Sequence, residues 1–117
     1  MKYKGLLLDI DNTLYDYHSV HKMAKEKALM FCAKNFSIDL DKLYIAYENA
    51  RKRVHIELSE TASSHNRLLY FQKMLEFLDI NPLQYAYDVY NQYWDSFLNN
   101  LIPFDGVYDL LQKYRMR

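Results

Sequence analysis

Residues 3–15 of the chain read YKGLLLDIDNTLY, and this stretch decides how the remainder is interpreted. The apolar run over residues 3–10 is short, contains three consecutive leucines after Gly5 and reaches an acidic residue, which predicts a buried β-strand more strongly than a helix. Residues 9–13, DIDNT, are rich in side chains that hydrogen-bond to nearby backbone and so favour a turn. The stretch therefore predicts a strand that carries two aspartates into a turn.

Asp9 and Asp11 are two positions apart, so a curled turn can bring both carboxylates to one site. The apolar strand shields that site, and the amides of residues 10–13 can point hydrogen-bond donors at an anion. Mg²⁺ prefers such oxygen ligands, and a carboxylate beside the metal can attack phosphorus. The neighbouring carboxylate can donate a proton to the leaving oxygen and later accept one from water. The pattern favours phosphoryl-transfer chemistry.

After the turn, the spacing of apolar residues becomes helical. We expect four helices over about residues 17–35, 40–54, 66–78 and 82–101, followed by a last short helix that reaches residue 114. Asp39, Asn81 and Asp105 are predicted N-caps, and Pro82 is expected at the first helical position. The chain has two glycines in 117 residues, too few for the many strand-to-helix turns of a complete α/β enzyme. A mostly helical chain is expected.

The single predicted strand raises a question of pairing. A lone strand leaves its backbone groups without a ladder partner. Either residues 3–10 are not a strand, or the strands that belong beside it are absent.

Composition narrows the functional classes. The length allows one domain, and 15 Lys and Arg balance 15 Asp and Glu, so no net field attracts nucleic acid or an anionic membrane. Cys32 is the single cysteine, which excludes an intramolecular disulfide and indicates a reducing compartment. The apolar runs are too short for a membrane span, and the N-terminus lacks a signal-peptide pattern. We expect a cytoplasmic protein with neither a membrane nor a nucleic-acid partner.

The string Asp9-Ile10-Asp11-Asn12-Thr13 after an apolar run resembles the first motif, D-x-D-x-T, of the haloacid dehalogenase-like (HAD) hydrolase superfamily. The longer form D-x-D-N-T-L-Y is similar to members with a helical cap inserted after this motif. The resemblance implies an α/β parent fold, of which this mostly α chain would hold one N-terminal core strand, a four-helix cap and a return helix. The expected boundaries are 1–16 for the strand and its turn, 17–101 for the cap and 102–117 for the return to the core.

The resemblance also implies roles for three residues. Asp9 would be the phosphoryl-accepting nucleophile and bind Mg²⁺ through its carboxylate. Asp11 would be the general acid/base and offer its backbone carbonyl to the metal, and Thr13 would hold the turn and orient Asp11. Members that cleave carbon–halogen bonds generally lack the second aspartate, so Asp11 favours hydrolysis of a small phosphate monoester such as a nucleotide or a sugar phosphate.

The sequence departs from the family pattern after Pro103. The second, third and fourth family motifs (a Ser or Thr, a Lys and an acidic pair) would follow the return segment, and no candidate strand follows Tyr114. The chain is therefore expected to resemble the N-terminal portion of such an enzyme and to be inactive, or nearly so, on its own.

Other residues have an ordinary explanation beside a functional one. His65 and Arg67 open the third helix and are either solvated residues beside an N-cap or contacts to the substrate. His18 and His21 are expected at the surface, and Cys32 in the core. The aromatic residues around residue 90 leave open a non-catalytic helical module that binds a partner or forms a homodimer.

Overall fold

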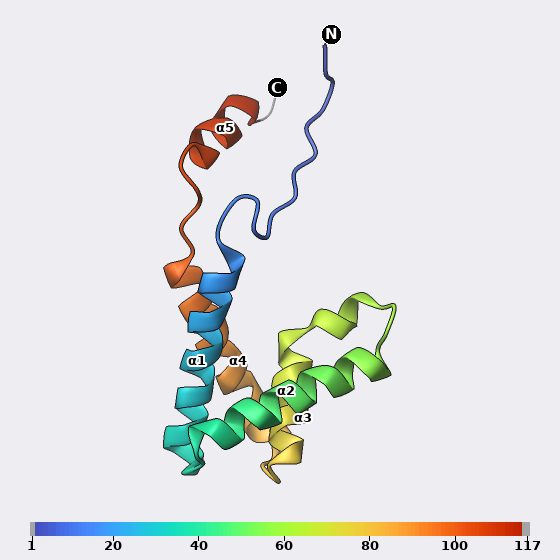
Figure 1. Cartoon of the computed structure of the whole chain (residues 1–117), viewed down its shortest axis with the longest axis vertical. Coiled ribbons are helices and arrows are strands. Elements are labelled where there is room, and N and C mark those ends of the chain that lie inside the picture. Colours follow the sequence, from blue (N-terminus) through green and yellow to red (C-terminus); the bar gives the residue numbers. More distant parts are fainter. Residues whose placement is uncertain (1, 116–117) are drawn as a thin grey trace.

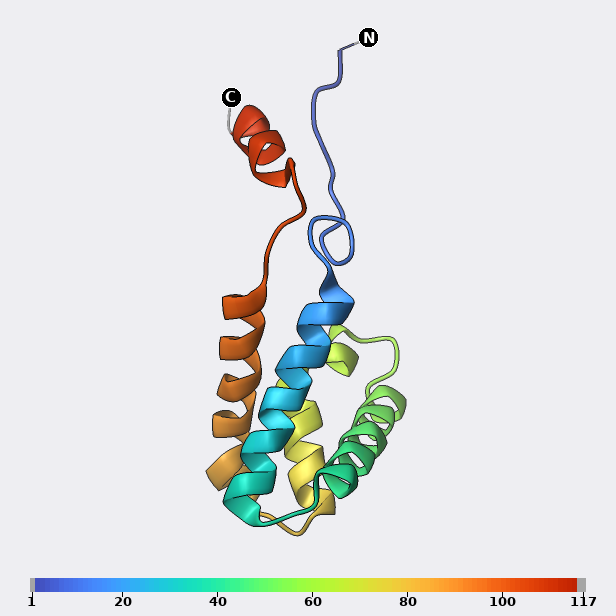
Figure 2. The same ribbon diagram turned by 60° about the vertical axis from the view of Figure 1, so that its left-hand side comes forward.

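The computed structural model describes residues 2–115, and its regular elements are all helical. In chain order these are α1 (Tyr17–Phe36), α2 (Leu40–Glu57), the 3₁₀ turn η1 (Ala62–His65), α3 (Arg67–Phe77), α4 (Pro82–Asn100) and α5 (Val107–Tyr114). Helix α1 packs along α4, and α2 packs against α3 (Figures 1 and 2). Helix α3 also packs against α4, and this contact joins the two pairs. Helices α1 to α4 thus form a bundle, while the N-terminal segment and α5 extend beyond one end of it (Figure 1).

Side-chain caps start four of the helices, α1 to α4. Asp39 accepts the amide of Asp41 at 2.8 Å at the start of α2, and Asn81 accepts the amide of Leu83 at 3.0 Å at the start of α4. Pro82 occupies the first turn of α4, as the sequence predicts. The expectation that Asp105 caps the last helix is wrong, because Gly106 takes the N-cap position of α5 with a left-handed φ of 84° and no side chain caps the helix.

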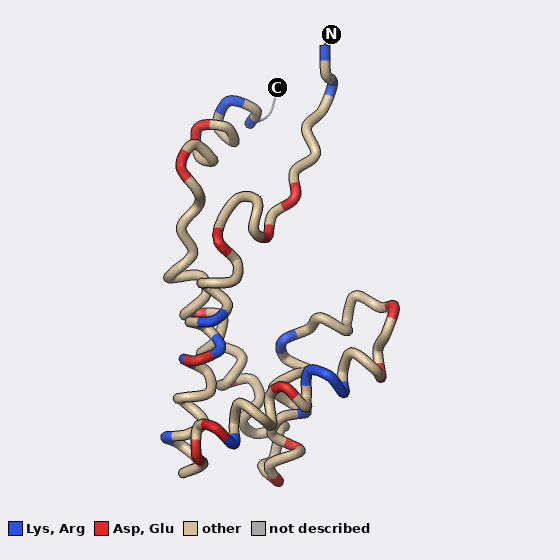
Figure 3. The backbone as a smooth tube through the Cα atoms, viewed as in Figure 1, with Lys and Arg blue, Asp and Glu red and all other residues tan. Residues whose placement is uncertain are grey.

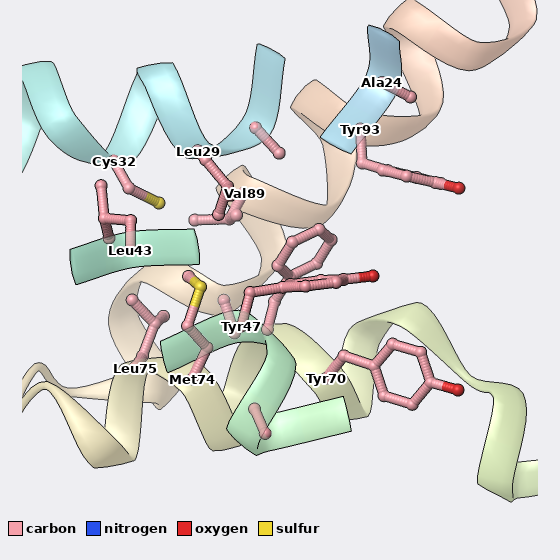
Figure 4. Close-up of a cluster of buried hydrophobic side chains, with 14 of the residues drawn as sticks. Ala24, Leu29, Cys32, Leu43, Tyr47, Tyr70, Met74, Leu75, Val89 and Tyr93 are labelled. Atoms are coloured by element: carbon pink, nitrogen blue, oxygen red, sulfur yellow. The ribbon is translucent and has the colours of Figure 1, made fainter. Parts of the chain in front are cut away.

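The core lies between the four helices of the bundle (Figure 4). Helices α1 and α2 contribute Leu29 and Leu43, and α3 and α4 contribute Met74 and Val89; all four are fully buried. Burying a side chain of this size contributes about 1.5–3 kcal/mol each. Cys32 is also fully buried, as predicted, and burial raises the pKa of its thiol to about 12. The cysteine is therefore a packing residue and not a reactive thiol.

The N-terminal segment carries no regular secondary structure over residues 2–10. The described residues contain only isolated bridges near it, between Asp11 and Tyr15 and between Tyr15 and Pro103. Residues 3–8 and α5 line a groove of about 1060 Å³, where Leu7 is 99% exposed and no residue of α5 is buried. The apolar run thus has no ladder partner within residues 2–115, and both the core strand and the α/β parent fold stay predictions.

Charged residues are interspersed along the helices (Figure 3). Four ion pairs lie between the described residues, and all of them involve partly exposed side chains on α1, α2 or α3. Exposed pairs of this kind add little stability. None of the described helices combines the length and apolar character needed to cross a membrane.

Candidate functional site

Residues 9–13, here called the aspartate turn, fold back on themselves just before α1. The amides of Thr13 and Leu14 donate to the carbonyl of Ile10 at 3.2 and 2.9 Å. Asn12 adopts a left-handed φ of 59°, a conformation that asparagine tolerates better than most residues. Its side-chain oxygen accepts the amide of Tyr17 at 2.9 Å, so the turn is fastened to the first residue of α1.

Each carboxylate of the aspartate turn has its own hydroxyl donor. The hydroxyl of Thr13 donates to Asp9 Oδ2 at 2.7 Å, and the phenol of Tyr15 donates to Asp11 Oδ1 at 2.5 Å. Thr13 therefore contacts Asp9, whereas the resemblance implied that it orients Asp11. Asp11 is held by Tyr15, a residue to which the sequence had assigned no role.

Tyr15 connects the aspartate turn to the helical core. Its side chain is 5% exposed, and its ring packs edge-on against Phe97 of α4 with 5.9 Å between centroids. Burial, followed by the hydrogen bond to Asp11, raises the pKa of the Tyr15 phenol, so Tyr15 is a donor at physiological pH. The carbonyl of Leu14 accepts the amide of Phe104 at 2.8 Å, which ties the turn to the segment that leaves α4.

A cleft of about 620 Å³ opens where the aspartate turn meets the bundle. Asp11 and Asn12 form one side, and His65, Asn66 and Arg67 at the junction of η1 and α3 form another. The remaining wall is mostly aromatic and comprises Tyr15, Tyr17, His18, Tyr90, Tyr93, Trp94 and Phe97. The fold thus brings Asp11, His65 and Arg67 to one cleft from positions more than fifty residues apart in the sequence. Asp9 and Thr13 belong to the adjoining turn but not to the wall.

Arg67 is half-buried in this cleft and is not a freely solvated residue. Its Nε donates to the hydroxyl of Tyr93 at 3.3 Å, its Nη1 to the carbonyl of His65 at 3.2 Å, and its Nη2 to the hydroxyl of Tyr17. The guanidinium also lies over the rings of Tyr70 and Tyr93, 5.3 and 5.7 Å from their centroids. Among the described residues, no carboxylate forms an ion pair with it.

The expectation that His21 lies at the surface is wrong. It is half-buried, stacks on Tyr17 with 5.3 Å between centroids and places Nδ1 2.7 Å from the hydroxyl of Tyr93. Burial, followed by the positive charges of Arg67 and Lys25, lowers the pKa of His21 to about 4, so the ring is neutral at physiological pH. His18 is exposed, as predicted.

The Tyr93 hydroxyl bridges Arg67 and His21. Arg67 has only donors, so the Tyr93 oxygen accepts from it. The same hydroxyl lies 2.7 Å from Nδ1 of His21, and the tautomer of the neutral ring decides which of the two groups donates. Arg67, Tyr93 and His21 are therefore linked by hydrogen bonds beside the cleft.

The aspartate turn offers a partial set of ligands for Mg²⁺. The exposed carboxylate of Asp9 and the backbone carbonyl of Asp11 are the hard oxygen donors that this ion prefers. Among residues 2–115 no group of three or more His, Cys, Asp or Glu side chains is arranged to hold a metal. Mg²⁺ commonly uses one or two carboxylates, with waters and substrate phosphate completing its six ligands, so the residues fit the ion as part of its site.

A comparison with curated proteins finds one phosphatase among the chain's relatives. The chain is 34% identical to a protein of Halopiger xanaduensis named ribulose-1,5-bisphosphate 5-phosphatase. The match covers 85% of this chain and spans 43% of the length of that relative. No protein-family model matches the sequence, and no solved structure matches the chain.

Proposed function

We propose that the protein is a Mg²⁺-dependent phosphohydrolase of the haloacid dehalogenase-like type, acting on a small phosphorylated molecule of which a sugar bisphosphate is the best candidate. The observation that carries the proposal is the cleft, in which the aspartate turn faces a half-buried arginine. The similarity to a phosphatase, over a match that includes 85% of this chain, supports the same activity, and the name of that relative supports the sugar bisphosphate.

In the proposed reaction, Asp9 attacks the phosphorus of the substrate. A bond forms between a carboxylate oxygen of Asp9 and phosphorus while the bond from phosphorus to the ester oxygen breaks, leaving an aspartyl-phosphate. Asp11 gives a proton to the departing oxygen, then takes one from the water that hydrolyses the intermediate. The Asp9 carboxylate and the Asp11 carbonyl would hold Mg²⁺, which would supply positive charge to offset the phosphate oxygens.

The neighbouring hydroxyl donors prepare these two carboxylates for different tasks. The bond from Thr13 restrains Asp9 Oδ2 and leaves Oδ1 without a partner among the described residues. Tyr15 holds Asp11 from the core side, so the acid/base group has a fixed position relative to the nucleophile. Holding reacting groups in place in this way lowers the barrier by removing the entropy cost of finding the right geometry.

The junction of η1 and α3 is the proposed substrate-binding side of the cleft. His65 is exposed and Arg67 half-buried there, and both can contact the part of the substrate that does not react. The aromatic wall gives a sugar carbon skeleton an apolar surface, which is a typical composition for a small-molecule site.

The 117-residue chain by itself is expected to show no measurable turnover. Phosphoryl transfer depends almost wholly on positioning and on charge that balances the transferring group. The described residues place carboxylates at the turn without a third metal ligand or a lysine in the cleft. Turnover by the purified 117-residue chain that disappears in Asp9→Asn would contradict this expectation.

The activity itself is tested on the protein produced from its complete reading frame. We expect Mg²⁺-dependent release of phosphate from ribulose 1,5-bisphosphate, lost in Asp9→Asn and retained in Asp95→Asn, an exposed aspartate on α4. Release that survives Asp9→Asn would place the chemistry elsewhere.

A non-catalytic helical module is the second candidate. The groove between residues 3–8 and α5 favours it, because its apolar side chains are exposed and could bind a partner or a second copy. Such a module would ignore both Mg²⁺ and the phosphate mimic beryllofluoride, whereas the proposed enzyme binds both at Asp9.

A further inference from the structure

The positive charge of Arg67 has no negative counterpart among residues 2–115. All three of its hydrogen-bond acceptors are neutral, namely two tyrosine hydroxyls and a backbone carbonyl. Each of the other arginines that forms an ion pair in the structure, Arg51 and Arg53, does so with a glutamate on its own helix. A partly buried cation normally has an anionic partner, because removal from water is costly. Arg67 is thus set up for an anion that the described chain does not itself provide.

Tyrosines hold the guanidinium in place without neutralising it. The side chains of Tyr47, Tyr70 and Tyr93 direct their hydroxyl groups towards the same side of the core (Figure 4). Tyr70 and Tyr93 present their rings to Arg67, and such faces stabilise a cation while leaving its net charge unchanged. Although burial acts against the charge, the bond to Tyr93 and the nearby phenols raise the pKa of Arg67, so it stays charged throughout the physiological range.

Arg67 also keeps donors to spare. A guanidinium has five N–H groups, and three hydrogen bonds to the described residues leave two unused. A planar guanidinium matches two oxygens of a phosphate at once, which a lysine ammonium cannot do. Because Arg67 lies in the wall of the cleft, an anion can reach it from the same space that borders Asp11.

The two ends of the cleft differ in charge. Asp11 and the adjoining Asp9 make the aspartate turn negative, so a phosphate binds there only with help from the metal and the turn amides. Arg67 makes the other end positive, and it needs no metal to attract a second anion. We propose that Arg67 binds the second, non-reacting phosphate of a bisphosphate substrate and makes the cleft selective for molecules with two anionic ends. This inference rests on the proposed function for the identity of the first end.

Tyr17 and Tyr93 act as positioning residues in this arrangement. By accepting from Nη2 and Nε they fix two sides of the guanidinium plane, and the hydrogen bond between Tyr93 and His21 holds Tyr93 in turn. A pre-positioned fork loses little freedom when the phosphate arrives, so more of the interaction contributes to affinity.

A binding measurement tests the inference, and the chain contains its own fluorescent reporter. Trp94 is the single tryptophan of the chain and lies in the cleft wall, so its fluorescence reports occupancy of this cleft. In buffer with Mg²⁺, we expect ribulose 1,5-bisphosphate to bind the chain more tightly than ribulose 5-phosphate. Arg67→Gln should weaken bisphosphate binding roughly 10- to 100-fold, the loss typical of a hydrogen bond to a charged group. Arg53→Gln, on the exposed side of α2, is the matched control and should bind as the unchanged chain does.

Equal affinities of the unchanged chain for the two sugar phosphates would overturn the inference, as would a folded Arg67→Gln variant with undiminished bisphosphate binding. Should that variant fail to fold, the ¹⁵N resonance of Arg67 Nε in the unchanged chain replaces it. We expect this resonance to move with added bisphosphate, and a resonance that stays in place at saturation would also overturn the inference.

A second assay separates this inference from the proposed function. In the protein from the complete reading frame, Arg67→Gln should reduce kcat/KM for ribulose 1,5-bisphosphate at least about tenfold more than for p-nitrophenyl phosphate, which has one anionic end. Equal losses on both substrates would contradict the role of Arg67 while leaving the phosphatase intact. If neither substrate is hydrolysed, the proposed function fails, and the fluorescence titration alone decides whether Arg67 is an anion site.

Discussion

At the scale of single residues, the cleft depends on polar side chains that the core holds from behind. Tyr15 fixes Asp11, and Tyr93 fixes both Arg67 and His21. Both tyrosines are almost completely buried, so each hydroxyl is a rigid extension of the core into the cleft. The groups that meet a substrate are therefore positioned by packing and not by exposed loops alone.

The depressed pKa of His21 predicts a dependence of stability on pH. The ring binds a proton near pH 4 in the folded state and near 6.5 in the unfolded state. Between these values the unfolded state takes up a proton that the folded state does not, so stability is complete above pH 6.5 and falls as the pH drops towards 4. Allowing for solvent screening of the half-buried ring, the loss is on the order of 1–3 kcal/mol.

Urea unfolding at a series of pH values measures this effect. His21→Gln should flatten the dependence between pH 4 and 6.5, whereas the exposed neighbour His18→Gln should leave it unchanged. An unaltered pH profile in His21→Gln would mean that another group is responsible.

At the scale of elements, the start of a helix was readable from the sequence where a polar cap precedes it. Asp39 and Asn81 act within a few residues of the amides they accept, so their function needs no knowledge of the fold. The prediction that Asp105 is the N-cap of the last helix was wrong by a single position, because the N-cap of α5 is Gly106 in a left-handed conformation.

The cap of α4 is the most direct of these features to test. Asn81→Ala should lower the free energy of unfolding by about 1 kcal/mol, because the Leu83 amide loses its acceptor. Asn91→Ala, an exposed asparagine within the same helix, is the matched control and should not destabilise, since alanine is the better helix former. Chemical denaturation of both variants checks the difference, and equal effects would contradict the role of the cap.

The cleft was harder to predict than the helices. The aspartate turn was identified from five consecutive residues, but Arg67 meets it only through the packing of α1, α3 and α4. His21 lies four residues after Tyr17, on the helix face that turns towards Tyr93, and nothing local reveals that this face is covered. The role of Tyr15 was missed for the same reason, because its hydrogen bond to Asp11 depends on burial against Phe97.

At the scale of the whole molecule, the bundle is a packed unit, whereas its two flanking segments are not packed against it. Leu29 is fully buried between helices, and Leu7, in the apolar run before the aspartate turn, is 99% exposed. Both residues are apolar in the sequence, but the periodicity of a short apolar run does not show which other segments of the protein cover that run.

Two matched substitutions test whether the bundle is packed while the N-terminal segment is not. Leu29→Ala should cost about 2–5 kcal/mol, the range for removing a fully buried leucine side chain. Leu7→Ala should change the stability of the same chain by no more than about 0.5 kcal/mol. Comparable losses in thermal or chemical unfolding would show that the N-terminal segment packs in solution as tightly as the bundle does.

The central claim is that Asp9 forms a covalent bond to the phosphoryl group of a substrate at the edge of this cleft. Its most direct test uses the protein from the complete reading frame, mixed with phosphate-labelled ribulose 1,5-bisphosphate and Mg²⁺ and quenched in acid within one turnover. We expect label on the peptide that contains Asp9, released by hydroxylamine as an acyl phosphate is, and absent in Asp9→Asn. Substrate hydrolysis with no labelled protein, or with label on a peptide that lacks Asp9, would contradict the account.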